Sequence, residues 1–180
     1  MNAKNILIII NSLSPGGAER QVVQDANLLA SVGHKVSVLI FKNGALLDQL
    51  DKNIQFTILN AKSNFGLIIE LLKYFRKAKQ EVIFSHLFKS NFLTSIACFF
   101  LRRRFFAFEH GLGTWKKWHH KMMSKFIARR TKAIISCSSK SKGIQVEMFK
   151  IPEQKILVIP NSIVSNNRLS EKNIPVHNES

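Results

Sequence analysis

The sequence has few acidic residues, only two cysteines and no long apolar run. Asp and Glu number 11 against 27 Lys and Arg, which gives a formal net charge of +16 over 180 residues. This excess of positive charge indicates an anionic partner, such as phosphate, a membrane surface or a nucleic acid, and does not by itself indicate a fold. Because 46% of the residues are hydrophobic, the chain does not belong to the intrinsically disordered class.

The scarcity of cysteine argues against two kinds of stabilising site. Cys98 and Cys137 form no C-x-x-C pair, so we expect neither a structural zinc site nor a disulfide framework. The longest apolar run, 92–101, is about half the ~20 residues that a membrane-spanning helix needs. No signal peptide is visible. We therefore expect a cytoplasmic protein, soluble or peripheral at the inner face of the membrane.

Strand and helix patterns alternate along the chain. The continuous apolar run at 5–11 is typical of a strand buried on both faces of a parallel sheet. The alternation predicts an α/β fold, a doubly wound, mostly parallel sheet of about seven strands with helices on both faces. We expect one domain at 1–165 and a disordered tail at 166–180. The predicted strands are 5–11, 35–41, 53–59, 81–85, 104–109, 133–137 and 155–159, and the predicted helices are 18–32, 64–79, 89–101, 114–130 and 138–149, with at most a short helix at 45–50.

The loop after the first strand contains the glycine pair Gly16 and Gly17. Two glycines allow positive φ and close backbone approach, and the next helix offers unpaired N–H groups to an anion. Alternatively, the pair only makes a tight turn, and spacing alone does not separate the two interpretations. The chain lacks G-x-G-x-x-G, G-x-x-x-x-G-K-[ST] and G-x-S-x-G, which disfavours a dinucleotide oxidoreductase, a P-loop enzyme and an α/β-hydrolase.

An ordered set of short motifs carries a family resemblance. The motifs are PGGAER at 15–20, NLLA at 27–30, GHKV at 33–36, SH at 85–86 with KSN at 89–91, EHG at 109–111, IISCS at 134–138 and KILVIPN at 155–161. Over about residues 4–163 the chain resembles the Rossmann-like N-terminal domain of family 4-type glycosyltransferases, of the GT-B class. In that family the N-terminal domain mostly holds the acceptor, and a C-terminal domain holds most of the nucleotide-sugar donor.

The resemblance implies the acceptor-side half of a bacterial enzyme of polysaccharide or cell-envelope biosynthesis. The complete enzyme would transfer a sugar from a nucleotide-sugar donor to a saccharide or lipid-linked acceptor, and this chain would hold no cofactor of its own. The C-terminal donor-binding domain is expected to be absent, so the chain alone is expected to be inactive. We favour a truncated fragment over one subunit of a split enzyme with a separate donor-domain subunit. The alternative class is a non-catalytic basic α/β module that binds anionic membrane or nucleic acid.

Residues at two predicted strand ends are the site candidates. By resemblance His110 reaches the reaction centre, where we assign it positioning ahead of proton abstraction, and Glu109 would orient it or act as a counter-ion. His86 ends the fourth strand, and Lys89, Ser90 and Asn91 open the next helix. That arrangement suits acceptor hydroxyl or phosphate contacts, although Ser90 or Asn91 equally suits a helix start. His34, between a helix and a strand, is expected to be structural.

Residues 101–142 hold 12 cations and one acid, Glu109, with interleaved aromatic residues. Three interpretations stay open: a core-facing stripe with a solvated cationic face, an interfacial helix on anionic lipid, and a nucleic-acid surface, which ranks last. The stripe consists of Trp115, Trp118, Met122 and Phe126, which share one side of the predicted helix. His119 and His120 lack the spacing of a metal site. The candidate membrane-facing residues are Trp115, Lys117, Trp118, Lys121 and Lys125.

Overall fold

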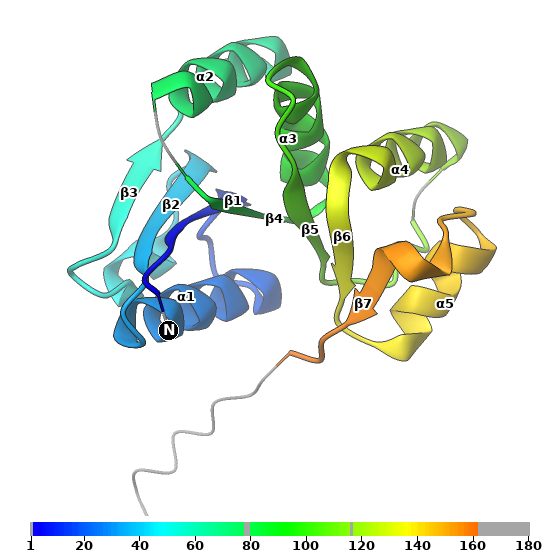
Figure 1. Cartoon of the computed structure of the whole chain (residues 1–180), viewed down its shortest axis with the longest axis horizontal. Helices are drawn as coiled ribbons and strands as arrows, with labels where there is room; N and C mark the ends of the chain where they lie inside the picture. Colours follow the sequence, from blue (N-terminus) through cyan, green and yellow to red (C-terminus); the bar gives the residue numbers. More distant parts are fainter. Residues whose placement is uncertain (1, 78–79, 116, 162–180) are drawn as a thin grey trace, which may run out of the picture.

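The computed structural model describes residues 2–77, 80–115 and 117–161, and these form one seven-stranded sheet with helices on both faces (Figure 1). The strand order is β3-β2-β1-β4-β5-β6-β7, and every pairing is parallel. The predicted doubly wound α/β fold is confirmed. The elements are β1 (Asn5–Ser12), α1 (Gly17–Ser31), β2 (Lys35–Lys42), the 3-10 helix η1 (Ala45–Gln49), β3 (Gln55–Ile58), α2 (Asn64–Lys77), β4 (Val82–His86), α3 (Phe88–Phe100), β5 (Phe105–Glu109), α4 (Trp118–Arg130), β6 (Thr131–Ser136), α5 (Ser139–Glu147), the 3-10 helix η2 (Glu153–Lys155) and β7 (Ile156–Val158).

The central strand β1 separates two hydrophobic clusters. Alternate side chains of a strand point to opposite faces. Thus Leu7 and Ile9 pack with the buried sides of α2, α3 and α4, whereas Ile6, Ile8 and Ile10 pack with α1 and η1. Figure 1 shows α1 on one side of the sheet and α2, α3 and α4 on the other. The uninterrupted apolar run of β1 therefore serves two cores at once.

The chain changes direction across the sheet between β1 and β4. Strands β1 to β3 proceed outward to one side of β1, and β4 to β7 proceed to the other. In open α/β sheets, ligands bind in the crevice that forms beyond the carboxyl ends of the strands at such a switch point. The carboxyl ends of β1 and β4 flank this crevice, and the side chain of His86 stands at the end of β4.

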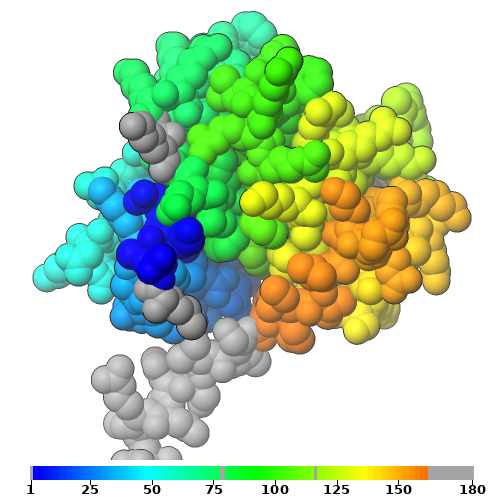
Figure 2. Space-filling model, in the orientation of Figure 1, coloured from blue at the N-terminus to red at the C-terminus, as the bar shows by residue number. Residues whose placement is uncertain are grey.

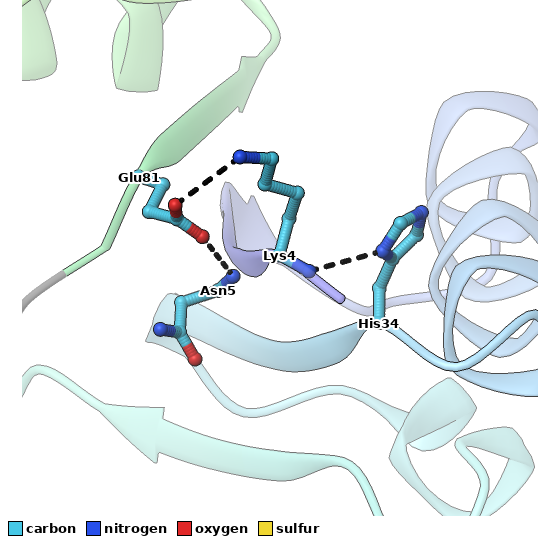
Figure 3. A network of polar contacts seen from close by, with 4 residues as sticks. All are labelled: Lys4, Asn5, His34 and Glu81. Atoms are coloured by element: carbon cyan, nitrogen blue, oxygen red, sulfur yellow. Dashed lines mark hydrogen bonds and ion pairs between the residues drawn. The ribbon is translucent and has the colours of Figure 1, made fainter. Parts of the chain in front are cut away.

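The amino ends of β1, β2 and β4 are tied together by polar contacts (Figure 3). The backbone N–H of Lys4 donates to His34 Nδ1 at 3.2 Å. The Glu81 carboxylate accepts from the backbone N–H of Asn5 at 3.0 Å and from Lys4 Nζ at 3.3 Å, and these contacts hold its pKa below the usual value. The position of His34 agrees with the structural role expected of it.

The helix predicted from Thr114 begins later, at Trp118. Gly113 has φ of +69°, outside the helical region, and Lys117 is extended at the position before the first helical residue. Trp115 therefore belongs to the β5–α4 loop and does not extend a helical stripe.

The exposed side chains of α4 exclude the core-facing interpretation of its aromatic stripe. Trp118 and Met122 are 72% and 63% exposed, while Ser124, Ile127 and Ala128 form the buried side of the helix. Of the predicted stripe, only Phe126 is partly buried, against Phe92 and Phe99 of α3. Within the described ranges, no helix is both long and apolar enough to cross a membrane. The predicted tail, 166–180, lies outside the described residues.

Candidate functional site

Two histidines from neighbouring strands meet at the carboxyl edge of the sheet. His86 Nδ1 and His110 Nε2 are 2.9 Å apart, within hydrogen-bond distance. The His86 ring stacks on Phe108, with centroids 4.3 Å apart and an interplanar angle of 16°. His110 lies beside His86 and not on the stack, with centroids 5.2 Å apart and an interplanar angle of 20°, and its centroid is 6.4 Å from that of Phe108. The strand register opposes His86 and Phe108, which places these two rings face to face.

Burial keeps both histidines neutral near pH 7. It lowers the pKa of His110 to about 4. His86 is 1% exposed, and burial, reinforced by the neighbouring His110, lowers its pKa well below the usual value. Two neutral imidazoles share a single hydrogen along their contact, so one ring donates and the other accepts.

The outer nitrogens of the pair are buried and unpaired. Among the described residues neither His86 Nε2 nor His110 Nδ1 has a hydrogen-bond partner. Either tautomeric arrangement leaves one of these nitrogens with a hydrogen and the other with a free lone pair. His110 Nδ1 can therefore be a donor or an acceptor, and a switch of both tautomers exchanges the two properties.

The first turn of α3 holds this pair in place. Ser90 Oγ donates to the carbonyl of His86, and Asn91 Nδ2 donates to the carbonyl of Phe108 at 3.1 Å. Leu87, between β4 and α3, has φ of +71°, which is rare for a branched residue, and its N–H donates to the Phe108 carbonyl at 3.2 Å. Such strained backbone is found preferentially at functional sites.

The other predicted residues around the pair differ in accessibility. Ser90 and Asn91 are fully buried and face the strands, so the structure gives them a supporting position. Lys89 is exposed on the same turn. Glu109 is half-buried, and one of its carboxylate oxygens lies 3.4 Å from Asn91 Nδ2. The residues predicted from the two strand ends are therefore brought together, with Lys89 and His110 more accessible than Ser90 and Asn91.

Asn91→Ala should destabilise the fold by about 1–2 kcal/mol, because the buried Phe108 carbonyl and Glu109 each lose a donor. Urea denaturation measures this change. Asn64→Ala, at the first residue of α2, is the control for loss of an asparagine from a helix start. Equal stability of wild type and Asn91→Ala would contradict the supporting role.

The glycine pair departs from its expected geometry. Neither Gly16 nor Gly17 has positive φ among the described glycines, and Gly16 is extended at φ −169°. A Cβ on Gly16 would lie 2.2 Å from a Glu19 carboxylate oxygen, whereas a Cβ on Gly17 would meet nothing within 4 Å. The Glu19 carboxylate beside the start of α1 disfavours the binding of an anion there. Of the two glycines, only Gly17 has free space around it.

Two residues of this crevice were missed by sequence reasoning. A Cβ on Gly44 would lie 2.1 Å from the carbonyl carbon of Leu13, so Gly44 lets the β2–η1 loop pack on the β1–α1 loop. The Leu46 N–H donates to the Leu13 carbonyl at 2.8 Å in the same contact. The dipeptide Asn43-Gly44 is a recognisable turn signal. Asn11 Oδ1 is buried without a described partner at the end of β1, and no local pattern marks it.

The candidate membrane-facing residues lie beside this site. Trp115 packs edge-on against Phe88 of α3 and His120 of α4, at 5.7 Å and 5.1 Å between centroids. Trp118 is fully on the surface, and Lys117, Lys121 and Lys125 accompany it along α4. No cluster of three or more His, Cys, Asp or Glu side chains that could hold a metal ion occurs in the described part of the chain.

The family model of Glycosyltransferase Family 4 matches residues 15–166. The chain belongs to this family. Family 4 membership confirms the resemblance read from the motifs, and the matched region includes both histidines and the glycine loop.

Three known proteins that resemble this family 4 chain are longer than it. One is the UDP-Gal:alpha-D-GlcNAc-diphosphoundecaprenol alpha-1,3-galactosyltransferase of Escherichia coli, 27% identical over 161 residues, which cover 82% of this chain and 42% of that enzyme. Among solved structures, Anabaena Alr3699/HepE with UDP-glucose superposes with a TM-score of 0.75 at 18% identity, over 89% of this chain and 44% of HepE. The glycosyltransferase of Rickettsia africae gives 0.64 at 24% identity, over 89% and 43%. This chain thus has the fold of a GT-B N-terminal half and spans less than half the length of these relatives.

Proposed function

We propose that this chain is the acceptor-side half of a glycosyltransferase that moves a sugar from a nucleotide-sugar donor to a saccharide or lipid-linked acceptor. The observation that carries the proposal is the His86–His110 pair at the carboxyl edge of the sheet. It adjoins the switch-point crevice, where an α/β sheet binds its ligand. Family membership supplies the reaction class. A donor-binding domain, in the same polypeptide or in a partner chain, completes the enzyme.

His110 is the residue that we assign to the reaction centre. With a pKa of about 4, its imidazole is a weak base near neutral pH and is suited to hydrogen-bond an acceptor or sugar hydroxyl. Positioning is therefore its main contribution, with His86 setting its tautomer and Glu109 beside it. Gly17 and Lys89 are accessible and complete the acceptor contacts, while Gly16, Ser90 and Asn91 shape the site.

The acceptor chemistry that we favour is a saccharide carried on a lipid diphosphate. The name of the E. coli relative gives such an acceptor, GlcNAc-diphosphoundecaprenol, and UDP-galactose as donor. Here Trp115, Trp118, Lys117, Lys121 and Lys125 form an exposed aromatic and basic surface next to the site. Aromatic rings at headgroup level with flanking lysines suit an anionic membrane. The enzyme would work at the inner face of the membrane in envelope polysaccharide synthesis.

A chimera tests the transferase proposal. Residues 1–161 joined to the C-terminal part of the E. coli relative should transfer galactose from UDP-galactose to GlcNAc-diphosphoundecaprenol, whereas the 180-residue chain alone should not. His110→Ala in the chimera should reduce kcat about 10–100-fold through lost positioning. His34→Gln, a histidine at the opposite edge of the sheet, should change kcat less than about twofold. Transfer by the chain alone, or equal kcat for both variants, would contradict the proposal.

Vesicle co-sedimentation tests the membrane surface separately. Vesicles of phosphatidylcholine with phosphatidylglycerol should retain the wild-type chain, and Trp115→Ala/Trp118→Ala should weaken retention about tenfold through lost interfacial burial. Phe65→Ala is the matched control, because Phe65 is 72% exposed at the start of α2, away from this surface. Equal loss in both variants, or tight oligonucleotide binding without lipid binding, would favour the non-catalytic binding module.

A further inference from the structure

The amino edge of the sheet carries two adjacent basic pockets, opposite the edge that holds the histidine pair. One has a volume of about 170 Å³ and is lined by five arginines, with Cys98 and Phe99 beside them: Arg102, Arg103, Arg104, Arg129 and Arg130. The other, of about 290 Å³, is lined by four cations over Ala128, Ile151 and Pro152: Lys125, Arg129, Lys150 and Lys155. Arg129 lines both, so we treat them as one feature, the amino-edge cleft.

The cleft forms where α4 meets the connection between α5 and β7. Figure 2 shows the orange connection lying against the yellow-green helix α4 on this side of the molecule. The surface side of α4 repeats at helical spacing, from Trp118 through Lys121 and Lys125 to Arg129. Because α4 has 13 residues, it spans about 20 Å and reaches from the carboxyl edge to this cleft.

No carboxylate neutralises these cations. Neither pocket has an acidic lining residue, and between residues 82 and 161 the chain contains only Glu109, Glu147 and Glu153. Glu153 pairs with Lys142 at 2.9 Å and, with Glu147, lines a different hollow beside α5. Lys125, Arg129 and Lys150 make no hydrogen bond or ion pair with any described residue. The cations of the amino-edge cleft are thus close together, with no acidic side chain among the residues that line it.

Two of the cations occupy strained backbone. Arg102 and Lys150 both have φ of +53°, and Leu87 is the third non-glycine residue with positive φ in the described ranges. Arg102 follows the last turn of α3, where the Arg103 N–H donates to the Cys98 carbonyl at 3.0 Å, a helix ending that usually places glycine at this position. The chain therefore keeps a cation at two turns where glycine would be the more stable residue.

Structural roles account for only part of the set. Arg103 donates to the carbonyls of Phe75 and Gln80, and Lys155 Nζ donates to the Thr131 carbonyl at 3.0 Å. Cations near the end of α4 also offset its dipole. These roles leave Arg102 and Lys150 unexplained. They also leave Arg130 Nε buried without a described hydrogen-bond partner, although its guanidinium stacks 4.3 Å from the Phe99 centroid.

We propose that the amino-edge cleft is a binding site for phosphate groups. Guanidinium groups bind phosphate oxygens through paired N–H donors, and a set of arginines around a small hollow is the usual way in which proteins hold a phosphate. The phosphate is either a lipid headgroup or a free phosphate, since both present the same oxygens. The cleft lies away from the candidate acceptor site, so the proposal is independent of the transferase function.

Titration of the 180-residue chain with inorganic pyrophosphate, and flotation with phosphatidylglycerol vesicles, test the proposal. We expect at least one of these probes to bind, and Arg102→Gly/Lys150→Gly to weaken its binding about tenfold through the loss of charge-assisted hydrogen bonds. The Tm of this variant should not fall, because glycine relieves the positive φ. Arg129→Gln, an exposed residue shared by both pockets, is a second variant and should show the same loss.

The control is Lys42→Gln/Lys62→Gln, which removes two exposed charges at the far side of the sheet. It should leave both affinities within about twofold of wild type. Pyrophosphate binding identifies a site for free phosphate. Vesicle binding that the cleft variants weaken, without pyrophosphate binding, identifies a headgroup site. Three results would overturn the proposal: binding of neither probe, equal losses in cleft and control variants, or tighter binding of a single-stranded oligonucleotide than of either probe.

Discussion

Replacing Gly44 by alanine should destabilise the protein by about 2–3 kcal/mol, the cost of forcing a methyl group into closely packed backbone. The new Cβ would lie 2.1–2.4 Å from the backbone of Leu13 and Ser14, which cannot swing away as a flexible side chain does. Gly44 itself is extended, with φ of −162°, so the effect is steric and not conformational. Urea denaturation of the variant measures the loss.

Gly17→Ala is the matched control, since its Cβ would meet nothing within 4 Å. This substitution at the first residue of α1 should be neutral or stabilise the fold by up to about 1 kcal/mol. Chemical shifts of Leu13 and Ser14, the residues that the new methyl group would meet, should move more in Gly44→Ala than in Gly17→Ala. Similar stability of the two variants would contradict the tight loop packing seen in the crevice.

Acidification from pH 7 to pH 5 should destabilise the protein by about 2 kcal/mol through His110, and His86 should add a loss in the same direction. In the folded chain the pKa of His110 is about 4, below the ordinary value of 6.5, and His86 is shifted in the same direction. Between these pH values the unfolded chain binds more protons than the folded one. Stability therefore falls as the pH drops below about 6.5, and the loss from His110 is complete near its folded pKa.

Urea denaturation at several pH values checks this prediction. The double variant His86→Asn/His110→Asn removes both titrating groups, so between pH 7 and pH 5 its stability should fall less than that of wild type, by at least about 2 kcal/mol. Carboxyl groups such as Glu81, whose pKa is lowered, contribute equally to both proteins. The same pH dependence in wild type and variant would show that the pair is not held neutral by burial.

The sheet could be predicted because its strands are runs of apolar residues in the sequence. Ile6–Ile10 needs burial on both faces, and the helices on the two sides of the sheet supply two separate cores. The start of α4 was less predictable. The aromatic spacing continues to Trp115, but the backbone leaves the helical region at Lys117, and helical periodicity does not report such a break. The exposure of Trp118 likewise depends on which side of α4 meets α3.

The residues of the candidate site could be predicted from the sequence, but the contacts between them could not. His86 and His110 each follow a strand run, but their contact depends on β4 and β5 being neighbours in register, a long-range property. Ser90 and Asn91 point inward because α3 starts at Phe88, which fixes the side of the helix on which each residue lies. The local sequence does not determine this starting residue. Gly44 packs against a loop that lies 30 residues earlier in the sequence, at Ser14. The sequence therefore indicates only the turn at Asn43-Gly44 and not this contact.

The central position of β1 also has a consequence for synthesis of the chain on the ribosome. One edge of β1 pairs with β2, which follows soon in the chain. The other edge pairs with β4, which is synthesised much later, since the partner of Ile6 is Val82. At about 5–20 residues per second, translation takes roughly 4–15 s to supply that partner. During this interval the five consecutive aliphatic residues of β1 lie beside an unpaired strand edge, so this segment is open to aggregation until β4 has been synthesised.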